Sequence, residues 1–258
     1  MNRGRRKVKF DEFFFSEDAK LYSFEESLED IVLNREFYRD KMYCPECEEA
    51  KLSFHDAKTP YLGKFPSSHH GEGCSYSYAI ASKKKAVEYY ENDTNDESIQ
   101  RKLKSCINIL SSTISEKSNL EKNDMSTKNK KARRFTFEDY DGTRLMLRKK
   151  RISRGLKNFS NYKEPVLFYG NVYIYWHHSD RYKYIHLKDN KGELICSIKI
   201  SDKVYEYLDN DIKLLTGDFR RVAFISKMEK KDAGKRIFNN CKLKRSTHLI
   251  VEKVIGLT

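Results

Sequence analysis

Five residues between positions 44 and 74 have the types and spacing of metal ligands. Cys44-Pro-Glu-Cys47 forms a tight knuckle with two thiols, and a glycine-containing turn further along carries His69, His70 and Cys74. Two thiolates at one end of a short loop, with an imidazole and a third thiolate at the other, are typical of a tetrahedral Zn²⁺ site. We predict that Cys44, Cys47, His70 and Cys74 bind the metal, with His69 as the alternative imidazole.

The same ligand set predicts what the metal does. Thiolates combined with an imidazole favour zinc over harder cations. Four protein ligands leave no position open for water or substrate, so we expect a structural zinc ion rather than a catalytic one.

Composition narrows the class of partner. The chain has 258 residues, of which 34% are charged and 38% hydrophobic, and its formal net charge is +13. A basic excess of this size favours a polyanionic partner, either nucleic acid or an anionic membrane surface. We expect no membrane partner, because no apolar run is long enough to span a bilayer and the basic N-terminus is not followed by the apolar core of a secretory signal.

The remaining cysteines bear on the compartment. Cys106, Cys196 and Cys241 are scattered along the chain and do not form a disulfide framework. We therefore expect a reducing, cytoplasmic location.

Residues 1–92 predict a small zinc-pinned domain. A capping-box spacing and periodic apolar residues predict a helix over 24–40. Between the ligand pairs, residues 51–55 and 60–65 have the pattern of a hairpin, and a helix is expected after Cys74. A metal can hold such a domain where its core would be too small.

The order Cys-Pro-x-Cys, hairpin, His-x-x-x-Cys over residues 40–78 resembles the N-terminal zinc module of competence-protein-like and other mobile-element proteins of bacteria. The resemblance implies that Cys44, Cys47, His70 and Cys74 are the metal ligands. Proteins of that kind often continue into a nuclease domain, but no nuclease pattern follows here, so that activity is not carried over.

Residues 93–131 predict a helix followed by a flexible linker. An apolar stripe at helical spacing, which includes Leu103 and Ile107, predicts a helix over 96–115. Such a stripe is usually a packing face and sometimes a partner-binding one. Residues 115–131 are polar and have the composition of a linker.

The following stretch carries most of the net charge. Residues 126–161 contain 12 Lys or Arg against 3 Asp or Glu. Such a run is either a solvated face or a phosphate-contacting surface, and its local concentration favours the second. The residues expected to contact phosphates here are Arg148, Lys149, Lys150, Arg151 and Arg154.

Residues 132–258 predict a basic, OB-like β-barrel. Strand patterns cover residues 166–176, 182–188 and 194–200, a short helix is expected over 201–208, and a fourth strand over 220–228. The fifth strand is either 238–243 or 248–254. Three strands, a helix and two further strands is the element order of a five-stranded OB-fold. The fold class is therefore α+β: a zinc-pinned hairpin-plus-helix domain, a linker and a C-terminal OB-like barrel.

OB-folds bind oligonucleotides on one face through stacking aromatic rings and basic side chains. The candidates on this part of the chain are Tyr173, Tyr175, Arg181, Tyr182, Lys183, Tyr184, Lys199, Arg221, Lys227, Lys230, Lys231, Lys235 and Arg236. His177, His178 and His186 have no convincing ligand spacing for a second metal site.

The function predicted is non-enzymatic binding of single-stranded DNA or RNA, weakened by salt. One alternative is a metal-dependent nuclease that uses carboxylates such as Glu138, Asp139, Asp141, Asp209 and Asp211. The other is an adaptor subunit of a mobile-element or phage-defence complex, in which the zinc module or the 96–115 helix binds protein.

Overall fold

The computed structural model describes residues 10–112, 135–153, 156, 162–179, 182–232 and 237–254. Within them the protein is mixed α+β and divides into two compact units. Unit 1 comprises residues 1–80 and 116–146, and unit 2 comprises residues 81–115 and 147–258. These units do not coincide with the expected ranges 1–92, 93–131 and 132–258, and the expected linker over 115–131 lies outside the described residues.

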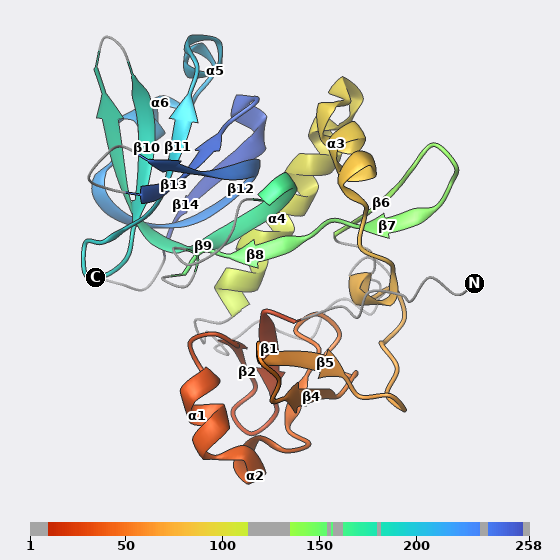
Figure 1. Ribbon diagram of the computed structural model, residues 1–258. Helices are drawn as coiled ribbons and strands as arrows, with labels where there is room; N and C mark the ends of the chain where they lie inside the picture. Colours follow the sequence, from red (N-terminus) through yellow and green to blue (C-terminus); the bar gives the residue numbers. More distant parts are fainter. Residues whose placement is uncertain are drawn as a thin grey trace, which may run out of the picture. The chain divides into compact units, whose positions relative to one another are not determined.

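Unit 1 is built from small β-elements and two short helices (Figure 1). Its three-stranded sheet has the order β2-β1-β3, with β1 at Glu12–Phe15, β2 at Lys20–Ser23 and β3 at Met42–Tyr43. Between β2 and β3 lie α1 (Leu28–Leu33) and α2 (Arg35–Tyr38), where the sequence predicted one continuous helix. The expected hairpin is formed by β4 (Leu52–His55) and β5 (Tyr61–Lys64), and the 3-10 turn η1 (Ser75–Ser77) follows.

A second hairpin belongs to unit 1 although it lies far along the chain. Strands β6 (Thr136–Glu138) and β7 (Arg144–Met146) pair antiparallel, and Met146 forms a parallel bridge with Ile80. The core of unit 1 is aromatic, with Phe10, Phe13 and Phe15 all buried. A core this small agrees with the expectation that the unit needs a further stabilising element.

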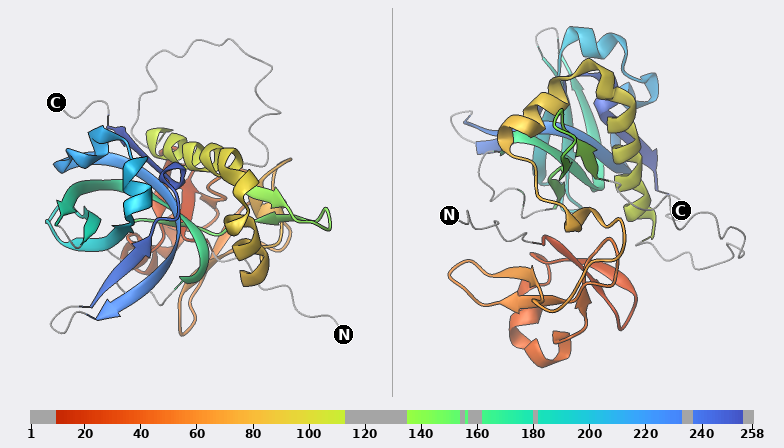
Figure 2. Two further views of the ribbon diagram at one scale, coloured as in Figure 1. Left: turned by 90° about the horizontal axis from the view of Figure 1, so that it is seen from above. Right: turned by 90° about the vertical axis from the view of Figure 1, so that its right-hand side faces the viewer.

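Unit 2 contains a closed five-stranded barrel (Figures 1 and 2). Its strands are β9 (Tyr162–His178), β10 (Lys183–Lys188), β11 (Leu194–Ile200), β12 (Thr216–Asp232) and β13 (Ile237–Lys242). Around the barrel the order is β9-β10-β11-β13-β12, and β12 pairs with β9 to close it. All neighbouring pairs are antiparallel except β11 and β13, which are parallel.

Short elements flank the barrel. Two helices, α5 (Asp202–Glu206) and α6 (Asn210–Lys213), connect β11 to β12. Strand β8 (Lys149–Arg151) pairs parallel with β9, and β14 (Leu249–Lys253) follows the 3-10 turn η5 (Ser246–His248) and pairs with β12.

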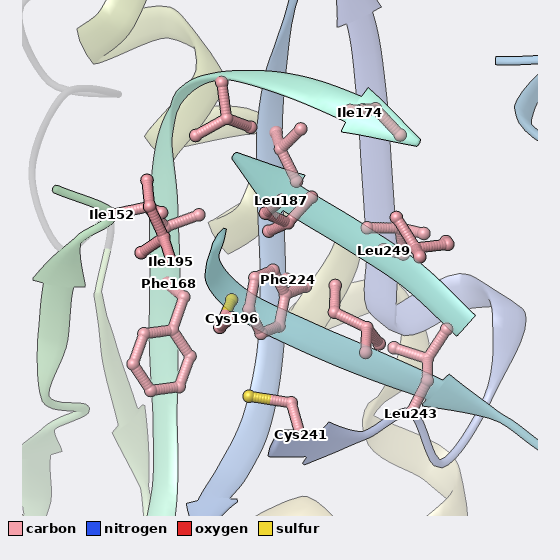
Figure 3. Packing of buried hydrophobic residues seen from close by; sticks show 14 of the residues in the cluster. Ile152, Phe168, Ile174, Leu187, Ile195, Cys196, Phe224, Cys241, Leu243 and Leu249 are labelled. Atoms are coloured by element: carbon pink, nitrogen blue, oxygen red, sulfur yellow. The ribbon is translucent and has the colours of Figure 1, made fainter. Parts of the chain in front are cut away.

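The barrel interior is filled by aliphatic and aromatic side chains with two cysteines among them (Figure 3). Cys196 and Cys241 are fully buried in this core. Simple alternation along β11 would place Ile195 on the opposite face from Cys196 and Ile198, but Ile195 belongs to the core as they do. The reason is an irregularity in the β10–β11 register next to Lys188, which shifts the alternation by one residue.

Helix α4 (Asp96–Ser112), expected in an inter-domain segment, packs on the outside of β9 and β12 (Figure 2). Leu103, Ile107 and Leu110 are fully buried. The apolar stripe is therefore a packing face of unit 2. Helix α3 (Lys83–Glu91) and the 3-10 turn η2 (Asp93–Asn95) precede it, and α3 also contacts β9.

Ion pairs and hydrogen bonds connect the start of α4 to the segment that follows β13. The carboxylate of Asp96 pairs with Arg245 at 2.5 Å and accepts a hydrogen bond from the hydroxyl of Thr247 at 3.0 Å. Lys244 pairs with Glu91 at the end of α3 at 2.9 Å. These contacts join residues near the start of unit 2 to residues near its end. The local sequence pattern therefore could not show that the helix belongs to the barrel.

One buried cation in α4 makes the stability of unit 2 depend on pH. Lys102 is 5% exposed, its Nζ donates to the hydroxyl of Ser98 at 2.9 Å, and it lies 5.3 Å from the ring centre of Tyr89. Burial lowers the pKa of Lys102 from 10.5 to about 8. The unfolded chain therefore binds more protons than the folded one between these values, so the free energy of unfolding should rise with pH in this window.

We expect Lys102→Met to remove this rise and to increase the free energy of unfolding at neutral pH, because it replaces a buried ammonium by an apolar chain of similar length. Urea denaturation at about pH 7.5 and about pH 10 would measure both effects. An unchanged pH slope in the variant would contradict the assignment.

Candidate metal centre and barrel face

The four predicted ligands of unit 1 converge on one point. The Sγ atoms of Cys44 and Cys74 lie 3.7 Å apart, and Nδ1 of His70 lies 3.5 Å from Cys74 Sγ and 3.6 Å from Cys47 Sγ. All four donor atoms lie within 4.8 Å of one another. The predicted grouping is confirmed, and His70 rather than His69 supplies the imidazole.

These distances fit a tetrahedral ion. Zn–S bonds of about 2.3 Å and a Zn–N bond of about 2.0 Å place two sulfurs about 3.8 Å apart and a sulfur about 3.5 Å from the nitrogen. A disulfide would instead require about 2.05 Å between sulfurs. The donor set is thus compatible with zinc.

Local backbone geometry presents the ligands. The amide of Cys44 donates to the carbonyl of Ala50 at 2.8 Å, and Glu48, with a φ of 58°, donates back to the carbonyl of Cys44 at 3.0 Å. On the second arm, the amide of Cys74 donates to the carbonyl of Gly71 at 3.2 Å. A Cβ atom at Gly71 would lie 2.3 Å from the carboxylate of Glu49, so a larger residue here would displace the exposed Glu49 side chain.

A supporting contact that the sequence reasoning missed lies behind the knuckle. Oε1 of Glu46 accepts hydrogen bonds from the amide and the hydroxyl of Ser75, at 3.0 and 2.8 Å. The hydroxyl of Ser75 in turn accepts from the amide of Phe135 at 3.1 Å. This chain ties both ligand arms to the β6–β7 hairpin. The only signal for it in the sequence is an acidic residue within the Cys-Pro-Glu-Cys knuckle.

The pKa values of the three cysteine thiols indicate why a cation would stabilise the cluster. Hydrogen bonding with Cys44 lowers the pKa of Cys47 and raises that of Cys74, and burial raises the pKa of Cys44 to about 12. Without a cation, the three thiols therefore do not all ionise readily. A divalent metal would offset the repulsion between the thiolates and stabilise all three.

In unit 2, ring and lysine side chains share the outer surface of β9, β10, β11 and β13. Residues such as Ile174, Ile185, Ile198 and Cys241 point into the core, so their neighbours along each strand point outward. We call the outward set the aromatic–lysine face. Its members are Tyr173, Tyr175, His177, Tyr184, His186, Lys188, Ser197, Lys199, Asn240 and Lys242.

The strand register arranges this face in rows. Tyr175 pairs with His186, which pairs with Ser197, and Ser197 pairs with Asn240. The next row runs from His177 through Tyr184 and Lys199 to Lys242. None of the ten residues of the face carries a carboxylate.

Several rings on the face are stacked. Tyr184 and His186 are 5.9 Å apart with nearly parallel planes, and Tyr182, which is 51% exposed, lies 6.2 Å from Tyr184. Tyr175 differs, because the ammonium of Lys188 lies 4.3 Å from its ring centre and its ring lies close to Gly217. Gly217 has a φ of 102°, which favours glycine, and a Cβ atom there would lie 3.2 Å from the Tyr175 ring.

The basic cluster before the barrel is not the exposed surface that the sequence predicted. Lys149 and Lys150 are 6% and 5% exposed, and both interact within the protein. Strand β8 packs beside β9, which places the Lys149 ammonium 5.9 Å from the ring centre of Tyr169. Arg221 is also buried, at 7% exposure, because its side of β12 lies under α4.

The other predicted cations lie in several different environments. Arg148, Lys183 and Lys227 are paired with Glu164, Asp202 and Glu91 respectively. Lys199 lies on the aromatic–lysine face, Arg151 is half-buried, and Lys230 and Lys231 are exposed on β12. Arg154, Arg181, Lys235 and Arg236 lie outside the described residues.

The carboxylates considered for a nuclease have local structural roles. Glu138 pairs with Arg144, Asp139 accepts from the amides of Asp141 and Thr143 in the β6–β7 turn, and Asp209 caps α6. Among the described residues, only the cluster of Cys44, Cys47, His70 and Cys74 is arranged to bind a metal ion. His177, His178 and His186 do not belong to it.

Within the described residues, no helix combines the length and apolar character needed to cross a bilayer. Comparison with known protein families finds no family whose sequence model matches this chain, and comparison with curated proteins finds no match. The resemblance of residues 40–78 to competence-protein-like zinc modules therefore stays a prediction.

Proposed function

We propose that this protein binds single-stranded nucleic acid on the aromatic–lysine face of an OB-like barrel, and that a structural zinc ion holds unit 1. The strand order supports the OB-like assignment. Numbered within the barrel it is 1-2-3-5-4, closed by pairing of strands 4 and 1, with helices between strands 3 and 4.

The observation that carries the proposal is the composition of the face. Rings at His177, Tyr184 and His186 lie beside lysines at 188, 199 and 242, with no carboxylate among the ten residues. A solvated sheet surface normally mixes both signs of charge. Rings flanked by an excess of cations are instead the combination that stacks bases and contacts phosphates, independently of sequence.

The test is a binding titration of the full chain. Fluorescence anisotropy with a labelled single-stranded oligonucleotide at low salt should show binding that weakens as salt is added. We expect Tyr184→Ala to weaken it by about 5- to 150-fold, the equivalent of about 1–3 kcal/mol for one stacked base.

Tyr207→Ala is the matched control, because Tyr207 is 73% exposed after α5 and does not belong to the face. It should bind as the unsubstituted protein does. No binding at low salt, or equal losses in the two variants, would refute the proposed function.

A further inference from the structure

A buried amide oxygen that has no hydrogen-bond partner among the described residues lies in the middle of the aromatic–lysine face. Asn240 is on β13 between Asn239 and Cys241, which both point toward the barrel interior, so its own side chain lies on the outer side. Asn240 is 6% exposed, and its Oδ1 atom is buried without a hydrogen-bond partner. A buried carbonyl oxygen without a donor costs about 1–3 kcal/mol.

The surroundings of Asn240 form a polar floor. Ser197, its partner on β11, is 1% exposed, and the Ser197 hydroxyl lies 2.9 Å from Nδ1 of His186. The next row contains Lys199 and Lys242 on the same two strands, and His186 stacks on Tyr184. A flat group stacked on these rings would lie next to this polar floor.

We propose that Asn240 reads the edge of one base of the bound strand and that this base is adenine. The inference rests on the proposed function and adds sequence selectivity to it. The unpartnered Oδ1 would accept the exocyclic N–H of adenine while the Nδ2 group donates to the adjacent ring nitrogen, which is the pairing that asparagine makes with adenine in protein–DNA complexes. The purine ring of adenine can also stack on Tyr184 and His186. Adenine has no carbonyl oxygen, so its edge would not form hydrogen bonds with the lysines in place of Asn240.

The test compares dA, dC and dT oligonucleotides of one length in anisotropy titrations of the full chain. The unsubstituted protein should bind dA more tightly than dT by about 5- to 150-fold, the equivalent of about 1–3 kcal/mol for one bidentate base contact. Asn240→Leu should lose this preference and bind dA no more tightly than dT. Lys242→Met is the control, because loss of a phosphate contact should weaken binding to all three alike.

Thermal unfolding of Asn240→Leu supplies a second readout. Replacing a buried amide whose oxygen has no partner by an apolar group of similar size should leave the melting temperature unchanged or raised. A lowered melting temperature would show that the amide is satisfied within the fold, and would overturn the inference.

The binding outcomes separate the two proposals. Equal affinity for the three oligonucleotides, or a preference for dA that survives in Asn240→Leu, overturns the base-reading role and leaves the proposed function standing. Failure to bind any of the three overturns both.

Discussion

Replacing His70 by alanine should unfold unit 1 and reduce the zinc content of the purified protein. The proposed zinc ion would hold two arms that are 23 residues apart in sequence at their nearest ligands, Cys47 and His70. Structural zinc contributes about 10–16 kcal/mol of apparent binding free energy at neutral pH, as much as the whole stability of a small domain. Removing one of four ligands therefore removes a large part of what keeps the unit folded.

His69→Ala is the matched control. His69 is adjacent in sequence, but only His70 has a ring nitrogen within reach of the thiols. Zinc content measured by atomic absorption and secondary structure followed by circular dichroism should be unchanged in this variant. A strong chelator should reproduce the effect of His70→Ala on the unsubstituted protein. If His70→Ala kept both its zinc and its fold, the site would not have the structural role assigned here.

Leu103→Ala should lower the free energy of unfolding of unit 2 by about 2–5 kcal/mol, the usual cost of truncating a fully buried leucine. Leu103 is 0% exposed where α4 lies against β9 and β12, so its truncation leaves a cavity beside the barrel. Urea denaturation would measure the loss as a lower midpoint with little change in slope.

Asn108→Ala provides the comparison on the same helix, since Asn108 is exposed. Its free energy of unfolding should stay within about 0.5 kcal/mol of the unsubstituted protein. The pair also bears on the adaptor hypothesis. If Leu103→Ala folded with unchanged stability, the apolar stripe of α4 would not be a packing face against the barrel. The hypothesis that α4 binds a partner protein would then be supported again.

Short-range chemistry was readable from the sequence. The knuckle at Cys44 and Cys47, and the His70 and Cys74 arm, are specified by residue type and by spacing within one turn. The strands of the barrel were also predictable, because side chains alternate with a period of two whichever strands later pair. The irregularity beside Lys188 was not, since it depends on how β10 and β11 align.

What the tertiary structure decided is which charged and apolar residues remain exposed. In the sequence, Lys149 and Lys150 look like a cationic surface and Leu103 like a candidate docking stripe. Burial depends on segments distant in the chain: β8 adds to the edge of β9, and α4 is held by Asp96 to Arg245, 149 residues away. The same long-range pairing brings Ser197 and Asn240 together on the outer face of the barrel. Composition therefore determined that the chain is basic and can bind a metal, whereas strand pairing determined where a polyanion could be bound.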